Sequence, residues 1–570
     1  MEKIILHVLN SGSFSGAENV VITIIKEFKK QKIEGYKFIY VSLNGNIRKR
    51  LQEENIIFEP IKDVSVSEIK RIIKKCAPDI IHAHDFTASI ICALAAGKIP
   101  VISHIHNNAP WIKKICKNSI VTIVLSRILD PEDYGVVAIV TVFVNLSQIF
   151  VTAGLGNALI QKKDADEKDF STMLWINILL SSLLYLILFL LAPIIASFYI
   201  YDDLSPLLRT LSFVLIIMSL NSIQVAYISK RMLFKNYFFS TLSSKIISGL
   251  IGIIMALTGF GAWALVGQTL SQRIIETAVL WFRVPWKPQK IFSIKKAKPL
   301  YSFAWKIMLM TFIESIRDQM RSLIIGKTCS SQDLAFYDKG ALLPNTFITN
   351  SLSSLSDVMF PVMSNYQNEN EKQLMAMRRW LSLLAYCSFP LLVILACVGK
   401  PLFLLVFTEK WLPAVPFLRV CCFTYAVWVF EVPIRETLKS KGYAGVCLKM
   451  QIVKSIISIA VIVLIMKKGI MAIAYSGIFC GIINIGISVY YGKKILGYKY
   501  TMVCKDVYQT LMFCVVITFL IYSVSFLKLP LIVALLIQLI VGIVAYIIVS
   551  YVIKNENFFY VIELVRRLKS

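Results

Sequence analysis

Long apolar runs fill most of the chain between residues 118 and 553, and they restrict it to the class of polytopic membrane proteins. A helix needs about 20 apolar residues to cross the hydrocarbon core of a bilayer. Thirteen runs reach this length, whereas the first, Ile120 to Leu129, has about half of it before a polar turn. The short helix is expected near Leu125, and the thirteen full-length helices near Leu146, Leu184, Leu215, Ile251, Val266, Met310, Leu352, Leu391, Cys422, Ile459, Phe479, Ile517 and Val541.

The composition agrees with this class, because 57% of the residues are hydrophobic and soluble domains average about 45–50%. A net charge of +27 would suggest nucleic-acid binding in a soluble protein. Here the lysines and arginines concentrate in alternate short loops, such as residues 283–298, while the opposite loops (202–203, 259–261, 527–530) carry few. By the positive-inside rule, the N-terminal segment and the C-terminus are expected in the cytoplasm, and nucleic acid is not expected as a partner.

Residues 1–114 alternate between short apolar runs and helical patterns, which predicts a partial α/β domain of Rossmann-like type. Continuous apolar strands separated by helices indicate a parallel sheet covered on both faces. The pattern stops after roughly five strands. We therefore expect three parts: an α/β domain (1–114), a membrane domain with a short first helix (115–500), and two additional helices with a tail (501–570).

The run from Leu300 to Ile325 holds the densest set of ionisable residues at membrane depth. Its charged residues are Lys306, Glu314, Arg317, Asp318 and Arg321. The last four fall within about a 100° arc of one helix face. Glu314 is placed to pair with Arg317, and Asp318 with Arg321. The stripe either lines a polar cavity that receives an anionic headgroup or forms an ion-pair network between helices.

Four other charged residues, Lys230, Arg231, Glu431 and Arg435, lie near the expected cytoplasmic ends of their helices. Anchoring at the membrane interface is the favoured interpretation, because long side chains there reach toward the headgroups.

Two stretches of the membrane part, Ser126–Gly135 (SRILDPEDYG) and Gly154–Lys162 (GLGNALIQK), resemble the Wzx-type polysaccharide flippases of the multidrug/oligosaccharidyl-lipid/polysaccharide exporter superfamily. So do Leu323–Lys327, Phe336–Lys339 and Leu343–Asn345. The resemblance implies two six-helix lobes around a cationic cavity, with two further helices at the C-terminus. It implies export of an undecaprenyl-pyrophosphate-linked oligosaccharide across the bacterial inner membrane, in lipopolysaccharide, capsule or exopolysaccharide biosynthesis. The family begins with a complete first helix, and this chain departs from that.

The segments Ser15–Glu18 and Pro78–His84 resemble the acceptor-side half of family 4 glycosyltransferases of GT-B fold. In the first strand-to-helix loop, Gly12, Gly16 and Glu18 are the candidates for contacts with a sugar-nucleotide phosphate at a helix N-terminus. The nucleotide-sugar half of such an enzyme does not follow, so catalysis by this chain alone is not expected.

No metal or other cofactor is expected. The twelve cysteines are scattered without zinc-like spacing. The two His-x-His pairs, His82 with His84 and His104 with His106, are interpreted as histidines at strand ends at the edge of a cleft, with metal binding as the less favoured alternative.

The sequence therefore predicts a transporter whose partners are a lipid-linked oligosaccharide, membrane lipids and other polysaccharide-assembly proteins. Two alternatives stay open. One is a drug or cation exporter of the same superfamily, which predicts an acidic cavity. The other is a glycosyltransferase fragment, either active with a partner chain or fused to a transporter that no longer works.

Overall fold

The chain forms two compact units in the computed structural model, one of residues 1–114 with 550–570 and one of residues 115–549. The structure describes all residues except 1–2, 10–15, 32–34, 46, 62, 85, 98, 105–119, 153, 163–164, 232, 367–368, 528 and 570. At some further positions inside helices and strands, it describes the backbone alone.

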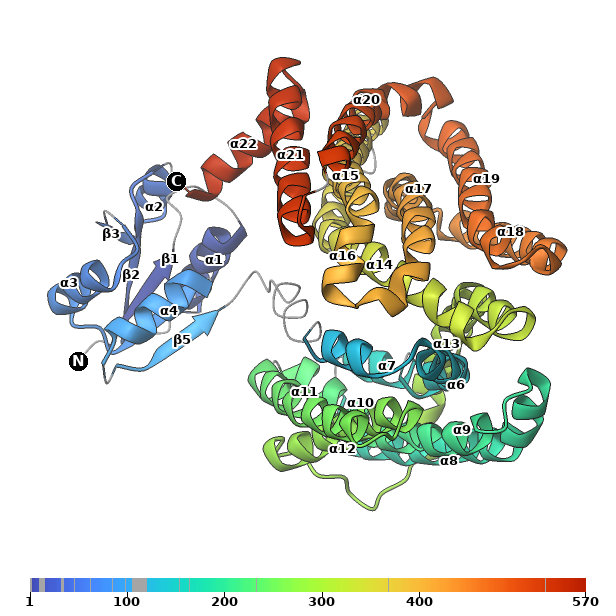
Figure 1. Cartoon of the computed structure of the whole chain (residues 1–570). Coiled ribbons are helices and arrows are strands. Elements are labelled where there is room, and N and C mark those ends of the chain that lie inside the picture. Colours follow the sequence, from blue (N-terminus) through green and yellow to red (C-terminus); the bar gives the residue numbers. More distant parts are fainter. Residues whose placement is uncertain are drawn as a thin grey trace. The chain divides into compact units, whose positions relative to one another are not determined.

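The first unit contains a parallel five-stranded sheet of order β3-β2-β1-β4-β5 (Figure 1). Its strands are β1 (Lys3–Leu9), β2 (Tyr36–Leu43), β3 (Ile57–Ile61), β4 (Ile80–His84) and β5 (Val101–His104). The alternating helices are α1 (Gly16–Lys30), α2 (Ile47–Glu53), α3 (Val66–Cys76) and α4 (Phe86–Ala95), and α22 (Glu556–Lys569) is grouped with this unit. The predicted parallel sheet of about five strands is confirmed.

Each face of this sheet is covered by apolar side chains from one pair of helices, as predicted for a parallel sheet. Alternate residues of β1 point to opposite faces. Leu6 and Val8 pack in the cluster that contains residues of α3 and α4, whereas Leu9 packs in the cluster that contains residues of α1 and α2. His7 has the same parity as Leu9 and therefore lies on the α1/α2 face.

The second unit is helical, and each of the thirteen predicted helix centres lies inside a long helix. Residues 120–128 form the short first helix, here called helix 120–128; residues 105–119, which precede it, lie outside the described part of the chain. The first lobe continues with α6 (Pro131–Thr152), α7 (Leu155–Gln161), α8 (Glu167–Tyr199), α9 (Leu204–Ser212), α10 (Val214–Arg231), α11 (Phe234–Leu257) and α12 (Ala262–Arg283).

The second lobe and the helices after it follow the same plan of long antiparallel helices. The second lobe consists of α13 (Ile294–Thr328), α14 (Ser331–Asn365), α15 (Asn370–Cys397), α16 (Gly399–Val406), η1 (Glu409–Ala414), α17 (Val415–Ser440), α18 (Ala444–Ile465), η2 (Met466–Lys468) and α19 (Ile470–Leu496). Two more long helices, α20 (Tyr500–Val524) and α21 (Leu531–Val552), are joined through η3 (Ser525–Leu527). The predicted plan of two six-helix lobes plus two helices is confirmed, with helix 120–128 counted as the first.

Ten helices in the described part of the chain are long and apolar enough to cross a membrane. Ten of the thirteen predicted full-length helices meet this criterion, and the other three are present as helices of at least 22 residues. The three long helices outside this set, α12, α13 and α14, have 22, 35 and 35 residues. They carry polar and charged side chains that line an interior cavity, as shown below, and these side chains lower their hydropathy.

The polar turn after helix 120–128 begins α6 by helix capping. Pro131 occupies the first helical position, where its missing N–H costs no hydrogen bond. The carboxylate of Asp133 accepts a hydrogen bond from the backbone N–H of Asp130, at 3.2 Å. In the second lobe, α14 begins in a similar way, with a capping box between Ser330 and Asp333.

Gly135 lies in the first turns of α6. It allows the start of α6 to approach the start of α14 closely. A methyl group on this residue would lie 1.8 Å from the carbonyl oxygen of Ser331. The glycine of the SRILDPEDYG stretch is therefore required by the packing of the two lobes against each other.

Candidate functional site

A cavity of about 1540 Å³ lies inside the second unit and is lined by residues of both lobes. The first lobe contributes side chains of helix 120–128, α6 and α12, and the second lobe contributes α13, α14, η1, α17, α18 and α19. Helices α13 and α14 supply Glu314, Arg317, Asp318, Arg321, Asp338 and Lys339. Helix α17 adds Glu431, Arg435, Glu436 and Lys439.

The charge of the cavity wall is unevenly distributed between the lobes. All ten of these charged side chains belong to the second lobe. The described lining of the first lobe is uncharged, with polar groups from Thr122, Tyr134, Thr141, Asn145 and Gln268. Among the described lining residues, five cations face five anions, so the cavity that the family resemblance implied to be cationic is lined here by a balanced set of charges.

Four of the five predicted cavity residues, Glu314, Arg317, Asp318 and Arg321, line this cavity together. The fifth, Lys306, lies in α13, and its side chain is outside the described part of the chain. The geometry thus places the charged stripe of α13 on the wall of an interior cavity, as a charged helix face in a membrane protein requires. The binding of a headgroup by this stripe stays a prediction.

The ion pairs predicted along α13 are wrong in their partners. Arg317 pairs with the adjacent Asp318 through Nε and Nη2, at 2.9 and 2.7 Å from Oδ1. Arg321 forms no ion pair with Asp318 among the described residues, and its Nη1 donates a hydrogen bond of 3.4 Å to the hydroxyl of Tyr337 on α14. A methyl group on Gly477 would lie 3.5 Å from the same Nη1, so this glycine of α19 leaves room for the guanidinium group.

Arg321 keeps one donor free for a ligand. Its Nε is buried and has no hydrogen-bond partner within the described residues. A buried N–H without a partner is unfavourable, so this group is suited to a ligand oxygen that enters the cavity.

A buried ion pair joins α17 to α18 beside the cavity. The ammonium group of Lys454 lies 2.6 Å from the carboxylate of Glu431 and donates a hydrogen bond of 2.8 Å to Ser488 on α19. The side chain of Lys454 is only 2% exposed. The interfacial role expected for Glu431 is therefore wrong, and Arg435 also faces the cavity. Sequence reasoning missed Lys454, although the single lysine within the apolar run 450–465 was a usable signal.

Lys339 occupies an aromatic cage at one end of the cavity. Its ammonium group lies 4.2 Å from the ring centre of Tyr134, 4.7 Å from that of Trp411 and 5.1 Å from that of Phe407. It also donates a hydrogen bond of 2.6 Å to the hydroxyl of Ser126. Cation–π attraction and this hydrogen bond compensate for burial of the charge. The sequence singled out Lys339 only as part of a family-like stretch.

Helix 120–128 is bound to the second lobe at the same end of the cavity. Arg127 Nε donates a hydrogen bond of 2.9 Å to the carbonyl of Val406, and its Nη2 donates to the carbonyl of Leu405. The indole N–H of Trp411 donates a hydrogen bond of 2.8 Å to the carbonyl of Ser126. Lys410 donates to the last carbonyls of the helix, those of Ile128 and Leu129. These contacts hold the end of helix 120–128 against the second lobe.

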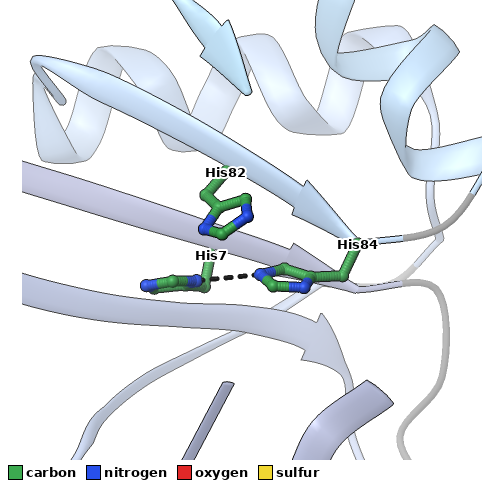
Figure 2. A group of neighbouring side chains, drawn as sticks. All are labelled: His7, His82 and His84. Carbon is green, nitrogen blue, oxygen red and sulfur yellow. Dashed lines mark hydrogen bonds between the residues drawn. The ribbon is translucent and has the colours of Figure 1, made fainter. Parts of the chain in front are cut away.

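In the first unit, three histidines meet on the α1/α2 face of the sheet (Figure 2). His7 of β1 is paired in register with His82 of β4, and His84 follows two residues later on the same face. His7 Nδ1 lies 3.0 Å from His84 Nε2. Burial, together with the proximity of His82, lowers the pKa of His7 to about 3, so its ring is neutral at neutral pH. Sequence reasoning missed His7, because only the strand order brings β1 and β4 together.

The other candidates in the first unit are only partly described. Gly16 is the first residue of α1, which agrees with a helix N-terminus after the first strand. Gly12 and His106 lie outside the described residues, as do the side chains of Glu18 and His104. Binding of a phosphate at this loop stays a prediction.

Two family models match different parts of the chain. Residues 124–416 match the model of the family described as polysaccharide biosynthesis protein, and residues 14–129 match that of glycosyltransferase family 4. The chain is 30% identical over 390 residues to a membrane protein in the cps region of Klebsiella pneumoniae, covering 66% of this chain and 78% of that one. It is 22% identical over 336 residues to the succinoglycan biosynthesis transport protein ExoT of Rhizobium meliloti (strain 1021), covering 58% and 67%.

Among solved structures, the lipid II flippase MurJ in an inward closed conformation has a similar fold. The TM-score is 0.65 at 15% sequence identity, and the match covers 78% of this chain and 99% of that one.

Proposed function

The chain belongs to the family of polysaccharide biosynthesis proteins, and on this premise we propose that it moves a lipid-linked oligosaccharide across the membrane. The observation that carries the proposal is the interior cavity with ten charged lining residues, among them the guanidinium groups of Arg317, Arg321 and Arg435. The proposed substrate is an undecaprenyl-pyrophosphate-linked oligosaccharide. The name of one relative, a succinoglycan biosynthesis transport protein, supports transport as the activity.

The physical need for such a cavity follows from the chemistry of the substrate. A charged group transferred into hydrocarbon costs at least several kcal/mol, and a sugar loses its hydrogen bonds to water. A polar passage between the two lobes removes both penalties, while the lipid chains stay in the bilayer. The cavity of about 1540 Å³ exceeds the roughly 300–1,000 Å³ of pockets for drug-sized ligands, which favours an oligosaccharide headgroup.

The balanced charges suit the two parts of this headgroup. Guanidinium groups form paired hydrogen bonds with phosphate oxygens, and the Nε of Arg321 has its donor available. Carboxylates such as Glu314 and Asp318 accept hydrogen bonds from sugar hydroxyls. Since every charged residue of the described cavity lining lies on the second lobe, we infer that this lobe holds the headgroup while the first lobe moves relative to it.

We further propose that the cage of Lys339 closes the external side of the cavity. Lysines and arginines in alternate loops favour a cytoplasmic location for the N-terminal segment and the C-terminus. With this orientation, in the bacterial inner membrane, the start of α14 lies on the external side and the end of α17, with Glu436 and Lys439, on the cytoplasmic side. The headgroup would then enter from the cytoplasm and leave when the cage opens.

The N-terminal segment is proposed not to transfer sugar by itself. Its single parallel sheet corresponds to one half of a two-domain glycosyltransferase, and such enzymes react between the two halves. Full-length protein in detergent, supplied with nucleotide sugars and a lipid-phosphate acceptor, should release no nucleoside phosphate above background. Sustained release that depends on residues 1–114 would contradict this proposal.

Complementation tests the export activity. The native host deleted for this gene should accumulate lipid-linked glycan on the cytoplasmic leaflet, and the wild-type chain should restore export. Reversal of two cavity charges in Arg317→Glu/Arg321→Glu should abolish export. Reversal of two exposed cations outside the cavity lining, in Lys467→Glu/Lys468→Glu, should leave it intact. Membrane levels of each variant are measured by immunoblot. Failure of the wild-type chain to restore export contradicts the proposal.

The same experiment distinguishes glycan export from the alternative, export of drugs or cations. The five anionic side chains that line the cavity are the observation in favour of this alternative. In that case, loss of the two arginines should leave transport of cationic drugs intact or improve it. Drug resistance in cells that express Arg317→Glu/Arg321→Glu, together with unchanged glycan export, would favour the alternative.

A further inference from the structure

The three histidines of the first unit lie where a sheet of this topology binds ligands. In the order β3-β2-β1-β4-β5, the chain runs outward from β1 to β3 on one side and then crosses to β4 on the other. The strand order therefore reverses between β1 and β4. Open parallel sheets bind ligands at the carboxyl ends of the two strands that flank such a switch point. His84 is the last residue of β4, and His7 lies two residues before the end of β1.

The imidazole rings converge closely enough to share one ion. One ring nitrogen from each of His7, His82 and His84 lies within 4.8 Å of the other two. The rings of His82 and His84 have centroids 4.1 Å apart, and the ring of His7 lies 4.9 and 5.3 Å from them. Two nitrogens that each lie about 2.0–2.1 Å from a tetrahedral Zn²⁺ are about 3.3 Å apart. The 3.0 Å separation between His7 and His84 nitrogens is close to this value, and small side-chain rotations would bring His82 into position.

The two nitrogens of the buried His7 ring have different surroundings. Nδ1 faces His84, whereas Nε2 has no hydrogen-bond partner among the described residues. An ion bound by Nδ1 leaves the ring proton on Nε2, so the tautomer required for binding breaks no hydrogen bond of Nε2 in the described part of the chain. Figure 2 shows the three rings grouped over the neighbouring strands, with His7 and His84 joined by the hydrogen bond.

We propose that His7, His82 and His84 form a binding site for a divalent transition-metal ion, for which Zn²⁺ is the reference. Three neutral imidazoles are the ligand type preferred by zinc and its neighbours, whereas Mg²⁺ and Ca²⁺ require oxygen ligands. The ion replaces the hydrogen bond between His7 and His84, and the ring that donated this bond then carries its proton on its other nitrogen, so that the facing nitrogen can bind the ion. Three ligands leave a fourth tetrahedral position open for water or an anionic oxygen.

This site differs from the pairs that the sequence offered. The sequence spacing groups only His82 with His84, because His7 lies 75 residues before His82 in the chain. It is the third imidazole, supplied by a different strand, that completes a set of ligands of the kind found in three-histidine zinc sites.

Metal binding to the full chain tests the proposal. Protein purified in detergent through a tag without histidines is treated with a chelator and titrated with Zn²⁺ and Co²⁺. We expect a single tightly bound Zn²⁺ per chain and a Co²⁺ spectrum typical of tetrahedral nitrogen coordination. His82→Ala/His84→Ala should weaken binding at least about 10-fold. The matched control, His104→Ala/His106→Ala, removes the two remaining histidines and should bind as the wild type does.

One further variant keeps the test decisive if the alanine substitutions disturb folding. His84→Cys retains a zinc ligand and should add an intense sulfur-to-cobalt charge-transfer band to the Co²⁺ spectrum. Absence of stoichiometric binding to the wild type overturns the proposal. So does equal binding by His82→Ala/His84→Ala, or a His84→Cys spectrum without the new band. Glycan export is not a readout here, so a negative result leaves the proposed transport function unaffected.

Discussion

Lys339 on α14 donates a hydrogen bond of 2.6 Å to the hydroxyl of Ser126, and this contact joins the second lobe to the short first helix. Residue 126 also accepts a hydrogen bond from the indole of Trp411 through its carbonyl. The ammonium group is buried among Tyr134, Phe407 and Trp411. The end of the short helix is thus held to the second lobe by a buried cation that lies within an aromatic cage.

The cage predicts an energetic coupling between Lys339 and Trp411. Loss of either side chain alone changes several interactions, but a double-mutant cycle isolates the pair. With Lys339→Met and Trp411→Leu, we expect a coupling of about 1–2 kcal/mol in the opening free energy of amides in residues 120–128. Hydrogen–deuterium exchange of the protein in detergent measures it. The control cycle pairs Trp411→Leu with Lys400→Met, an exposed lysine on α16, and should give no coupling. Independent effects of Lys339 and Trp411 would contradict the cage.

Gly135 predicts a steric limit on the packing of the lobes. Gly135→Ala places a methyl group 1.8 Å from the backbone oxygen of Ser331, which a side-chain rotation cannot relieve. We expect destabilisation of about 1–3 kcal/mol or more, seen as a lower temperature of thermal unfolding in detergent. Gly486→Ala in α19 is the matched control, because no neighbouring atom lies within 4 Å of the added methyl group. Alanine favours a helix over glycine by roughly 1 kcal/mol, so the control should be neutral or stabilising. Equal melting of the two variants would argue against the close approach.

Because Glu431 and Lys454 form a buried ion pair, we expect loss of one charge alone to destabilise the protein more than loss of both. Glu431→Gln leaves the ammonium group of Lys454 buried without its counter-charge, which should cost about 3–5 kcal/mol. Glu431→Gln/Lys454→Met removes both charges and should recover much of this loss. Thermal unfolding compares the variants, with Glu369→Gln as a control, since that residue forms an exposed ion pair with Lys372. A double variant less stable than Glu431→Gln would rule out the pairing as the cause.

An ion pair between Arg378 and Asp506 attaches α20 to the second lobe, and we expect its loss to weaken this attachment. Arg378 of α15 contacts both carboxylate oxygens of Asp506, and the hydroxyl of Tyr498 donates a hydrogen bond of 2.9 Å to the same group. Asp506→Asn should cost about 1.5–3 kcal/mol and raise hydrogen exchange in the first turns of α20. Lys505→Gln changes the adjacent exposed residue and should have no effect. Increased exchange in the control alone would contradict this role.

The elements of both units could be predicted because their signals are local. Each predicted centre from Leu146 to Val541 lies in a helix, since a bilayer requires long apolar runs wherever a helix crosses it. In the first unit, β1 (Lys3–Leu9) and β2 (Tyr36–Leu43) follow the predicted apolar runs. The turn at Asp130 is also local, because its proline and carboxylates act within one helical turn.

The partners of the charged residues could not be predicted in the same way. Helical spacing placed Glu314, Arg317, Asp318 and Arg321 on one face, and they do line one cavity. Spacing also favoured pairs three residues apart, but Arg321 has a closer partner in Tyr337 on the next helix. The pairing of Lys454 could not be predicted from spacing, because its counter-charge, Glu431, lies 23 residues away on a different helix.

The sequence by itself determined that this chain is a helical membrane protein preceded by a parallel α/β segment, because hydrophobic length and strand–helix alternation act over short stretches of chain. Only the tertiary structure decided which groups meet: Lys339 with three aromatic rings, Glu431 with Lys454, and His7 with His82 and His84. Such contacts depend on which helices and strands become neighbours. That choice is made by the packing of whole surfaces, and no local pattern of residues records it.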